Sequence, residues 1–112
     1  MKANDNGIIV SSWKGWTYGV RLLKKGWKKF LNIIGKCTKV IIELEDTGEK
    51  GIVNITSSFY KGCHELRGKI FKTYFERNGL TEWERGKPYK LRLVYIGVDP
   101  NSNLPIFRLE KL

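Results

Sequence analysis

The chain has 112 residues, of which 41% are hydrophobic and 12% aromatic, and its formal net charge is +10. This length predicts one domain, and the apolar and aromatic content excludes a disordered chain. The excess of positive charge favours an anionic partner, nucleic acid above all.

Other features exclude several classes of protein. Cys37 and Cys63 are too few for a disulfide framework, and with the single His64 they lack the spacing of a zinc site. The polar residues 1–6 are not typical of a signal peptide and predict a flexible lead to one domain at 7–112. Apolar runs are too short for a membrane helix. We therefore expect a cytoplasmic or nucleoid-associated protein in a reducing compartment, without a metal, cofactor or membrane partner.

The first predicted elements form a hairpin. Residues 7–13 are rich in β-branched and aromatic residues and predict a strand, after which Gly15 suits a tight turn. Alternating apolar residues from Trp16 to Leu22 predict a second strand with one buried face. The side chains of Trp16 and Tyr18 are therefore expected in the core.

Residues 24–34 predict an amphipathic helix with Trp27 on its apolar face. Its opposite side carries Lys24, Lys25, Lys28 and Lys29. Between Asn6 and Ile42 the chain has eight basic residues and no acidic one. A helix face that serves only solubility usually interleaves both signs, so these lysines are candidate phosphate contacts, with a solvated face as the alternative.

The remaining predicted elements repeat a helix followed by a hairpin. They are strands at 38–44 and 51–56, a helix at 64–78, and strands at 89–96 and 105–109. The order ββ-α-ββ-α-ββ, with six to seven short strands and two helices, predicts a small α+β barrel or pseudobarrel, because closure hides edge strands. The two helix–hairpin units, 24–56 and 64–110, are as compatible with a duplication as with chance.

The stretch Phe71–Leu80, together with Gly86 and the strand at 89–96, resembles the plant "B-three" DNA-binding domains and the recognition domains of some restriction endonucleases. In those families a helix ends in an apolar–Gly–Leu stop before a strand. The resemblance implies a pseudobarrel that grips DNA in the major groove between loop arms at one end. Two departures stand against it: the acidic residue expected after the glycine is absent from Gly86-Lys87-Pro88, and the N-terminal element order differs. No base-contacting residue is transferred.

A second basic group follows the second predicted helix. Lys90 and Arg92 alternate with leucines, so we expect them on one exposed strand face that makes a groove with the lysines of the first helix. Arg67 is expected in the apolar arc of the second helix, where it requires a polyanion or a carboxylate other than Glu65. Arg108 is a further possible member of the group. The candidate nucleic-acid-binding residues are Lys14, Arg21, Lys24, Lys25, Lys28, Lys29, Arg67, Arg85, Lys87, Lys90 and Arg92.

Catalysis is not expected. His64 is adjacent to Cys63, and neighbouring residues of a helix point in different directions, so they do not form a nucleophile–base pair. The carboxylates between Glu43 and Glu49 flank a turn, where they are ordinary solvating groups. No glycine-rich phosphate loop is present.

The first hypothesis is a nucleic-acid-binding module that prefers duplex DNA, because most tryptophans are assigned to the core. Single-stranded DNA or RNA is the alternative, and exposure of Trp13, Trp16 or the loop residue Trp83 would favour it. A third possibility, from another class, is a protein that docks on an acidic protein surface, such as an inhibitor.

Overall fold

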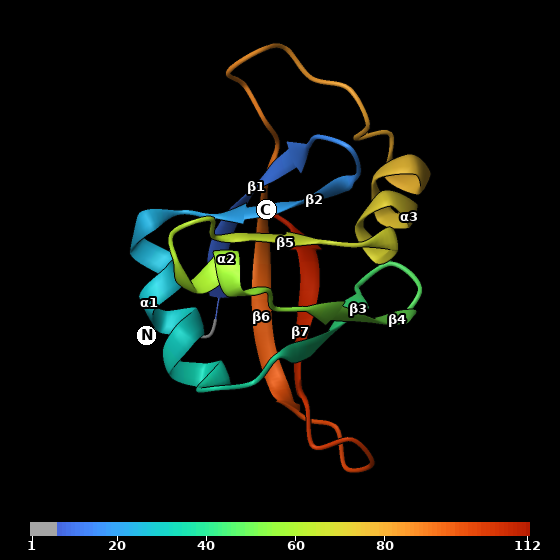
Figure 1. Cartoon of the computed structure of the whole chain (residues 1–112). Helices are drawn as coiled ribbons and strands as arrows, with labels where there is room; N and C mark the ends of the chain where they lie inside the picture. Colours follow the sequence, from blue (N-terminus) through green and yellow to red (C-terminus); the bar gives the residue numbers. More distant parts are fainter. Residues whose placement is uncertain (1–6) are drawn as a thin grey trace, which may run out of the picture.

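A computed structural model describes residues 7–112 and folds them into one seven-stranded sheet with three helices (Figure 1). The flexible lead predicted for residues 1–6 lies outside the described residues. The strands are β1 (Gly7–Lys14), β2 (Tyr18–Leu22), β3 (Lys39–Leu44), β4 (Lys50–Asn54), β5 (Glu65–Arg67), β6 (Lys90–Val98) and β7 (Pro105–Lys111), and the helices are α1 (Lys24–Ile34), α2 (Ser57–Tyr60) and α3 (Lys69–Asn78).

The sheet curls into a nearly closed barrel with the strand order β4-β3-β7-β6-β1-β2-β5. Neighbouring strands are antiparallel except for β3 and β7, which are parallel. The edge strands β4 and β5 approach each other, since a side chain placed at Gly68, directly after β5, would touch Val53 of β4. The predicted small α+β barrel is confirmed.

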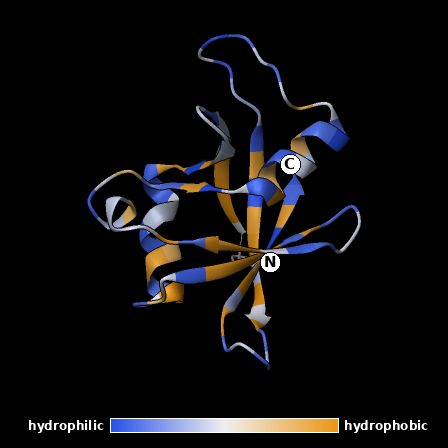
Figure 2. Cartoon of the chain, turned by 45° about the vertical axis from the view of Figure 1, so that its right-hand side comes forward, coloured by the Kyte–Doolittle hydropathy of each residue, from blue (hydrophilic) through white to orange (hydrophobic). Residues whose placement is uncertain are grey.

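The barrel interior holds one hydrophobic core to which every helix contributes. Phe30 of α1 lies 4.8 Å from Phe107 of β7 and 5.5 Å from Phe59 of α2, measured between ring centroids. Tyr74 and Phe75 of α3 are also fully buried. Full burial of each such side chain contributes about 1.5–3 kcal/mol. Hydrophobic colour accordingly concentrates on the central strands and hydrophilic colour on the loops (Figure 2).

The helices differ from the sequence prediction in two places. The helix predicted at 64–78 starts at Lys69, because Leu66 enters the core as part of β5 and pairs with Val20. Its end is as predicted: Gly79 has φ 69°, and the Leu80 amide donates to the Phe75 carbonyl at 2.8 Å. The single turn α2 was not predicted. No helix within residues 7–112 has the length and apolar character needed to cross a lipid bilayer.

Helix α1 approaches β1 very closely at Gly26. A Cβ atom at this position would lie 2.6 Å from Cγ2 of the buried Ile8. Glycine in a helix costs about 1 kcal/mol relative to alanine. The close contact explains why the helix nevertheless has a glycine here.

We expect Gly26→Ala to destabilise the protein by about 1–3 kcal/mol, because overpacking against Ile8 outweighs the gain in helix propensity. Urea unfolding measures the change. Asn32→Ala, at an exposed position of the same helix, is the control and should stabilise slightly. A more stable Gly26→Ala variant would contradict the close contact.

The end of α3 is tied to the β3–β4 turn by an ion pair. Arg77 donates from Nε to Oδ2 of Asp46 at 2.8 Å, and Asn78 donates to the same oxygen at 3.0 Å. The Arg77 hydrogen bond, with help from Asn78, lowers the pKa of Asp46 to about 2 against partial desolvation. The folded state therefore favours the ionised carboxyl, and this stability is lost as the pH falls from about 4 to about 2.

Asp46→Asn should lower the free energy of unfolding by about 1 kcal/mol at pH 7 and by clearly less at about pH 2, where about half of the wild-type carboxyl is already protonated. Thermal unfolding at the two pH values tests this. Glu76→Gln, which removes an exposed acid of α3 without an ion pair in the described structure, is the control. An equal loss at both pH values would show that the ion pair is not the cause.

Candidate functional site

The four lysines predicted on the first helix form the clearest group of unneutralised charges. Lys24, Lys25 and Lys28 are exposed and Lys29 is half-buried. Within residues 7–112, none of the four has an acidic group in ion-pair distance. We refer to these four residues as the α1 lysines.

The placement of the α1 lysines opposes the stability of their own helix. Lys24 and Lys25 occupy the first turn, which contains no acid, and a cation there is repelled by the positive end of the helix dipole. Lys24 and Lys28 are also four residues apart, as are Lys25 and Lys29, so like charges face each other. Helix stability therefore does not explain these residues.

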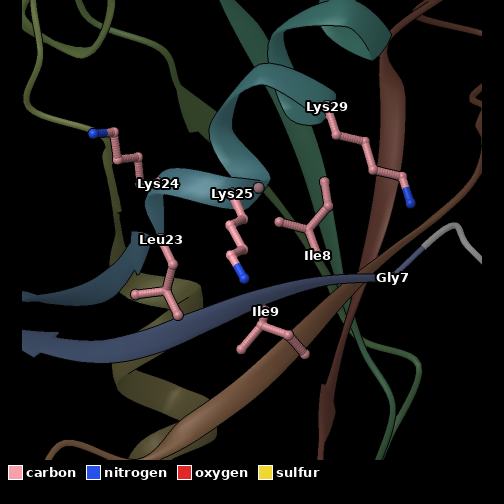
Figure 3. A pocket seen from close by; sticks show the side chains of 8 residues that line it. Gly7, Ile8, Ile9, Leu23, Lys24, Lys25 and Lys29 are labelled. Atoms are coloured by element: carbon pink, nitrogen blue, oxygen red, sulfur yellow. The ribbon is translucent and has the colours of Figure 1, made fainter.

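A pocket of about 610 Å³ opens between the start of α1 and β1. Ile9 and Leu23 form part of its apolar lining, and Ile9 is 38% exposed. Figure 3 shows Lys25 and Lys29 extending toward β1, while Lys24 points away from it. The pocket therefore combines an apolar floor with two ammonium groups, which lie on either side of Ile8 in Figure 3.

Arg92 of β6 reaches the same region from the sheet. It pairs with Ile9 across the strands and lies over Gly7, where a Cβ atom would be 2.6 Å from its Cδ. Its guanidinium donates to Glu110 at 3.2 Å, and its Nε is buried without a hydrogen-bond partner in the part of the chain described. The side chain of Arg92 therefore lies beside the pocket at α1, and Arg92 is also one of the basic residues predicted on the strand at 89–96.

The outer surface of the sheet extends from Arg92 across β6, β1, β2 and β5. Strand pairing places Lys90, Ser11 and Arg21 side by side, and in the next row Trp13, Gly19 and Arg67. Residues directly opposite in antiparallel pairs point to the same face, and the face opposite to this one packs into the core. We call this surface, with Arg92, Lys90, Arg21, Arg67 and Trp13, the basic sheet face.

The prediction for Arg67 was wrong about its element and its partner. Arg67 lies in a strand, where residues two apart share a face, so Glu65 faces it. Its Nη2 donates to Oε1 of Glu65 at 2.6 Å, and Arg21 donates from Nε to Oε2 at 3.0 Å. Burial opposes ionisation of Glu65, but the hydrogen bonds from Arg67 and Arg21 outweigh it and lower its pKa.

The tryptophans divide between core and surface. The prediction that Trp16 lies in the core was wrong: β2 begins only at Tyr18, and Trp16 is 83% exposed at the tip of the β1–β2 hairpin. Trp13 lies on the basic sheet face, with Arg67 4.8 Å from its ring centroid. Trp27 packs against the core as predicted. Trp83 contacts Tyr89 edge to face in the loop before β6.

Other predicted residues lie apart from this surface or are neutralised. Lys14 pairs with Glu82 at 2.9 Å and Lys87 with Glu84 at 3.0 Å. Arg85 and Lys87 belong to the loop between α3 and β6, which arches away from α1 at the top of Figure 1. Of the residues predicted to form a groove with α1, Lys90 and Arg92 therefore lie on the basic sheet face, whereas the loop residues Arg85 and Lys87 do not.

No catalytic or metal-binding arrangement stands out. In residues 7–112 no three His, Cys, Asp or Glu side chains are close enough to hold a metal ion. His64 stacks on Trp27 with 4.4 Å between ring centroids, next to the exposed Cys63. The prediction that the chain is not an enzyme remains a prediction.

Comparison of the chain with protein-family models, curated proteins and solved structures finds no match. The surface must therefore be interpreted from its own chemistry.

Lys24→Glu/Lys25→Glu should stabilise the protein by about 1 kcal/mol at low salt, because acids replace cations at the helix start and two like-charge pairs become opposite-charge pairs. The melting temperature measures the gain, which added salt should reduce. Lys61→Glu, at an exposed position after α2, is the control. A less stable double variant would mean that the two lysines make a structural contribution after all.

Proposed function

We propose that the chain binds nucleic acid through the α1 lysines and the basic sheet face. The observation that carries the proposal is the set of four lysines without acidic partners in the described structure, held where they oppose their own helix. Phosphate groups would relieve this repulsion and release counterions on binding. Lys90 extends the positive surface across the strands, and Arg21 and Arg67, which share the single carboxylate of Glu65, leave an excess of positive charge there.

A single strand is the form of nucleic acid that the surface favours. Duplex DNA was preferred from the sequence on the premise that the tryptophans are in the core, and Trp16 does not meet that premise. An exposed indole beside a row of cations offers stacking for an unpaired base together with contacts to its backbone. An acidic protein surface remains the alternative partner, because tryptophan also anchors protein–protein interfaces.

Fluorescence anisotropy with labelled single-stranded and duplex DNA and RNA, over a salt series, tests the proposal. We expect single strands to bind more tightly and the affinity to fall steeply with salt, with a slope of about −0.7 per phosphate contact. Lys25→Gln/Lys29→Gln should reduce this slope by about 1.4 and weaken binding to every sequence.

The matched control is Lys69→Gln/Lys72→Gln. It removes the same charge from α3, on the opposite side of the barrel from α1 (Figure 1). It should change binding much less. No binding to any of these polymers at about 50 mM salt would contradict the proposal, and equal losses in the two variants would contradict the assigned surface.

A further inference from the structure

A second pocket, of about 160 Å³, lies at the other end of the basic sheet face from α1. It is lined by Trp16, Asn54, Thr56, Glu65 and Arg67. These residues come from the β1–β2 hairpin tip, from the end of β4 and the residues after it, and from β5, and closure of the barrel brings them together. The pocket is about as large as one nucleobase. Its lining combines an indole with amide, hydroxyl, carboxylate and guanidinium groups, which are the side-chain types that recognise base edges.

Arg67 has hydrogen-bond donors to spare in this pocket. Its guanidinium has five N–H donors, and its one hydrogen bond among the described residues runs from Nη2 to Glu65. Its Nε is buried and has no hydrogen-bond partner in residues 7–112. The side chain is held in place, because Glu65 accepts from it and the Trp13 ring packs against it. A fixed guanidinium with unused donors is suited to a ligand with adjacent acceptors.

The carboxylate in the pocket does not balance these donors. One oxygen of Glu65 accepts from Arg67 and the other from Arg21, and the Glu65 side chain is only 8% exposed. The side-chain amide of Asn54, which also lines the pocket, makes no hydrogen bond in residues 7–112 and adds further donors. The pocket therefore favours a flat ligand whose edge presents acceptors.

We propose that this pocket holds one unstacked nucleobase, preferentially guanine, against Trp16, with Arg67 donating to its O6 and N7. Guanine presents these two acceptors side by side, whereas adenine pairs N7 with a donor and cytosine presents a donor. This inference rests on the proposed function, because the bound strand supplies the base. The α1 lysines contact phosphates of any sequence, and the pocket selects among bases.

The test compares oligothymidylate of one length carrying a single central guanine or adenine, with the all-thymine strand as reference. The wild type should bind the guanine strand about tenfold more tightly than the adenine strand. Arg67→Lys keeps the charge but loses the planar pair of donors, so the preference for guanine over adenine should fall to about twofold or less. Arg108→Lys is the matched control, a half-buried arginine paired with glutamate on β7, and should keep the preference.

Asn54→Ala provides a second variant, because Asn54 is exposed and its replacement leaves the core intact. It should also reduce the guanine preference without changing all-thymine affinity, and it decides the question if Arg67→Lys unfolds. Salt-sensitive binding with equal affinity for the guanine and adenine strands would overturn the base site and leave the proposed function standing. Absence of binding to all three strands would overturn both.

Discussion

The contact between Gly26 and Ile8 fixes the position of α1, and the surface described here depends on it. With no side chain at residue 26, the helix lies directly against β1. Phe30 and Ile34 then enter the core one and two turns later. The α1 lysines must occupy the remaining sides of the helix, and two of them extend toward β1 (Figure 3). A packing constraint inside the barrel thus determines where its strongest positive charge lies.

The distribution of acids makes this charge effective. Asp46 and Glu49 in the β3–β4 turn neutralise Arg77, and Glu110 of β7 pairs with Arg108. One side of the barrel is therefore largely balanced within itself. The chain from residue 7 to residue 42 has no acid at all, so α1 has no local counter-charge.

The fold was predictable where a pattern extends over several turns or residues. Helix 24–34 has both its apolar spacing and its terminating glycine, and the structure has the same bounds. Strand β5 has only three residues, which is too few for a period to be recognised. Because this segment was predicted as helix, the ion pair of Arg67 with Glu65 was not predicted either, since residues two apart share a face only in a strand.

The candidate site was less predictable than the fold, for a physical reason. The alternation of apolar and polar residues does not show where a strand begins. Trp16 was therefore predicted on the buried face of the second strand, although it lies in the hairpin tip before β2. Gly15 before it and Thr17 after it were the available signals of a tip. No local sequence pattern marks Asn54 or Thr56 as part of a binding site. They meet Arg67 only because the curled sheet brings β4 next to β5, which is a property of the whole barrel.

The two ends of the basic sheet face are suited to different tasks. Lysines at α1 are flexible point charges that fit a phosphate backbone without regard to sequence. Arg67 is held by Glu65 and by Trp13, and a fixed guanidinium can discriminate between base edges. Between the two ends of the face, Ser11 and Gly19 have small or no side chains, and Arg21 and Lys90 lie beside Ser11 on the neighbouring strands. In the proposed complex, affinity and selectivity thus depend on separate residues, and salt weakens the first without altering the geometry that provides the second.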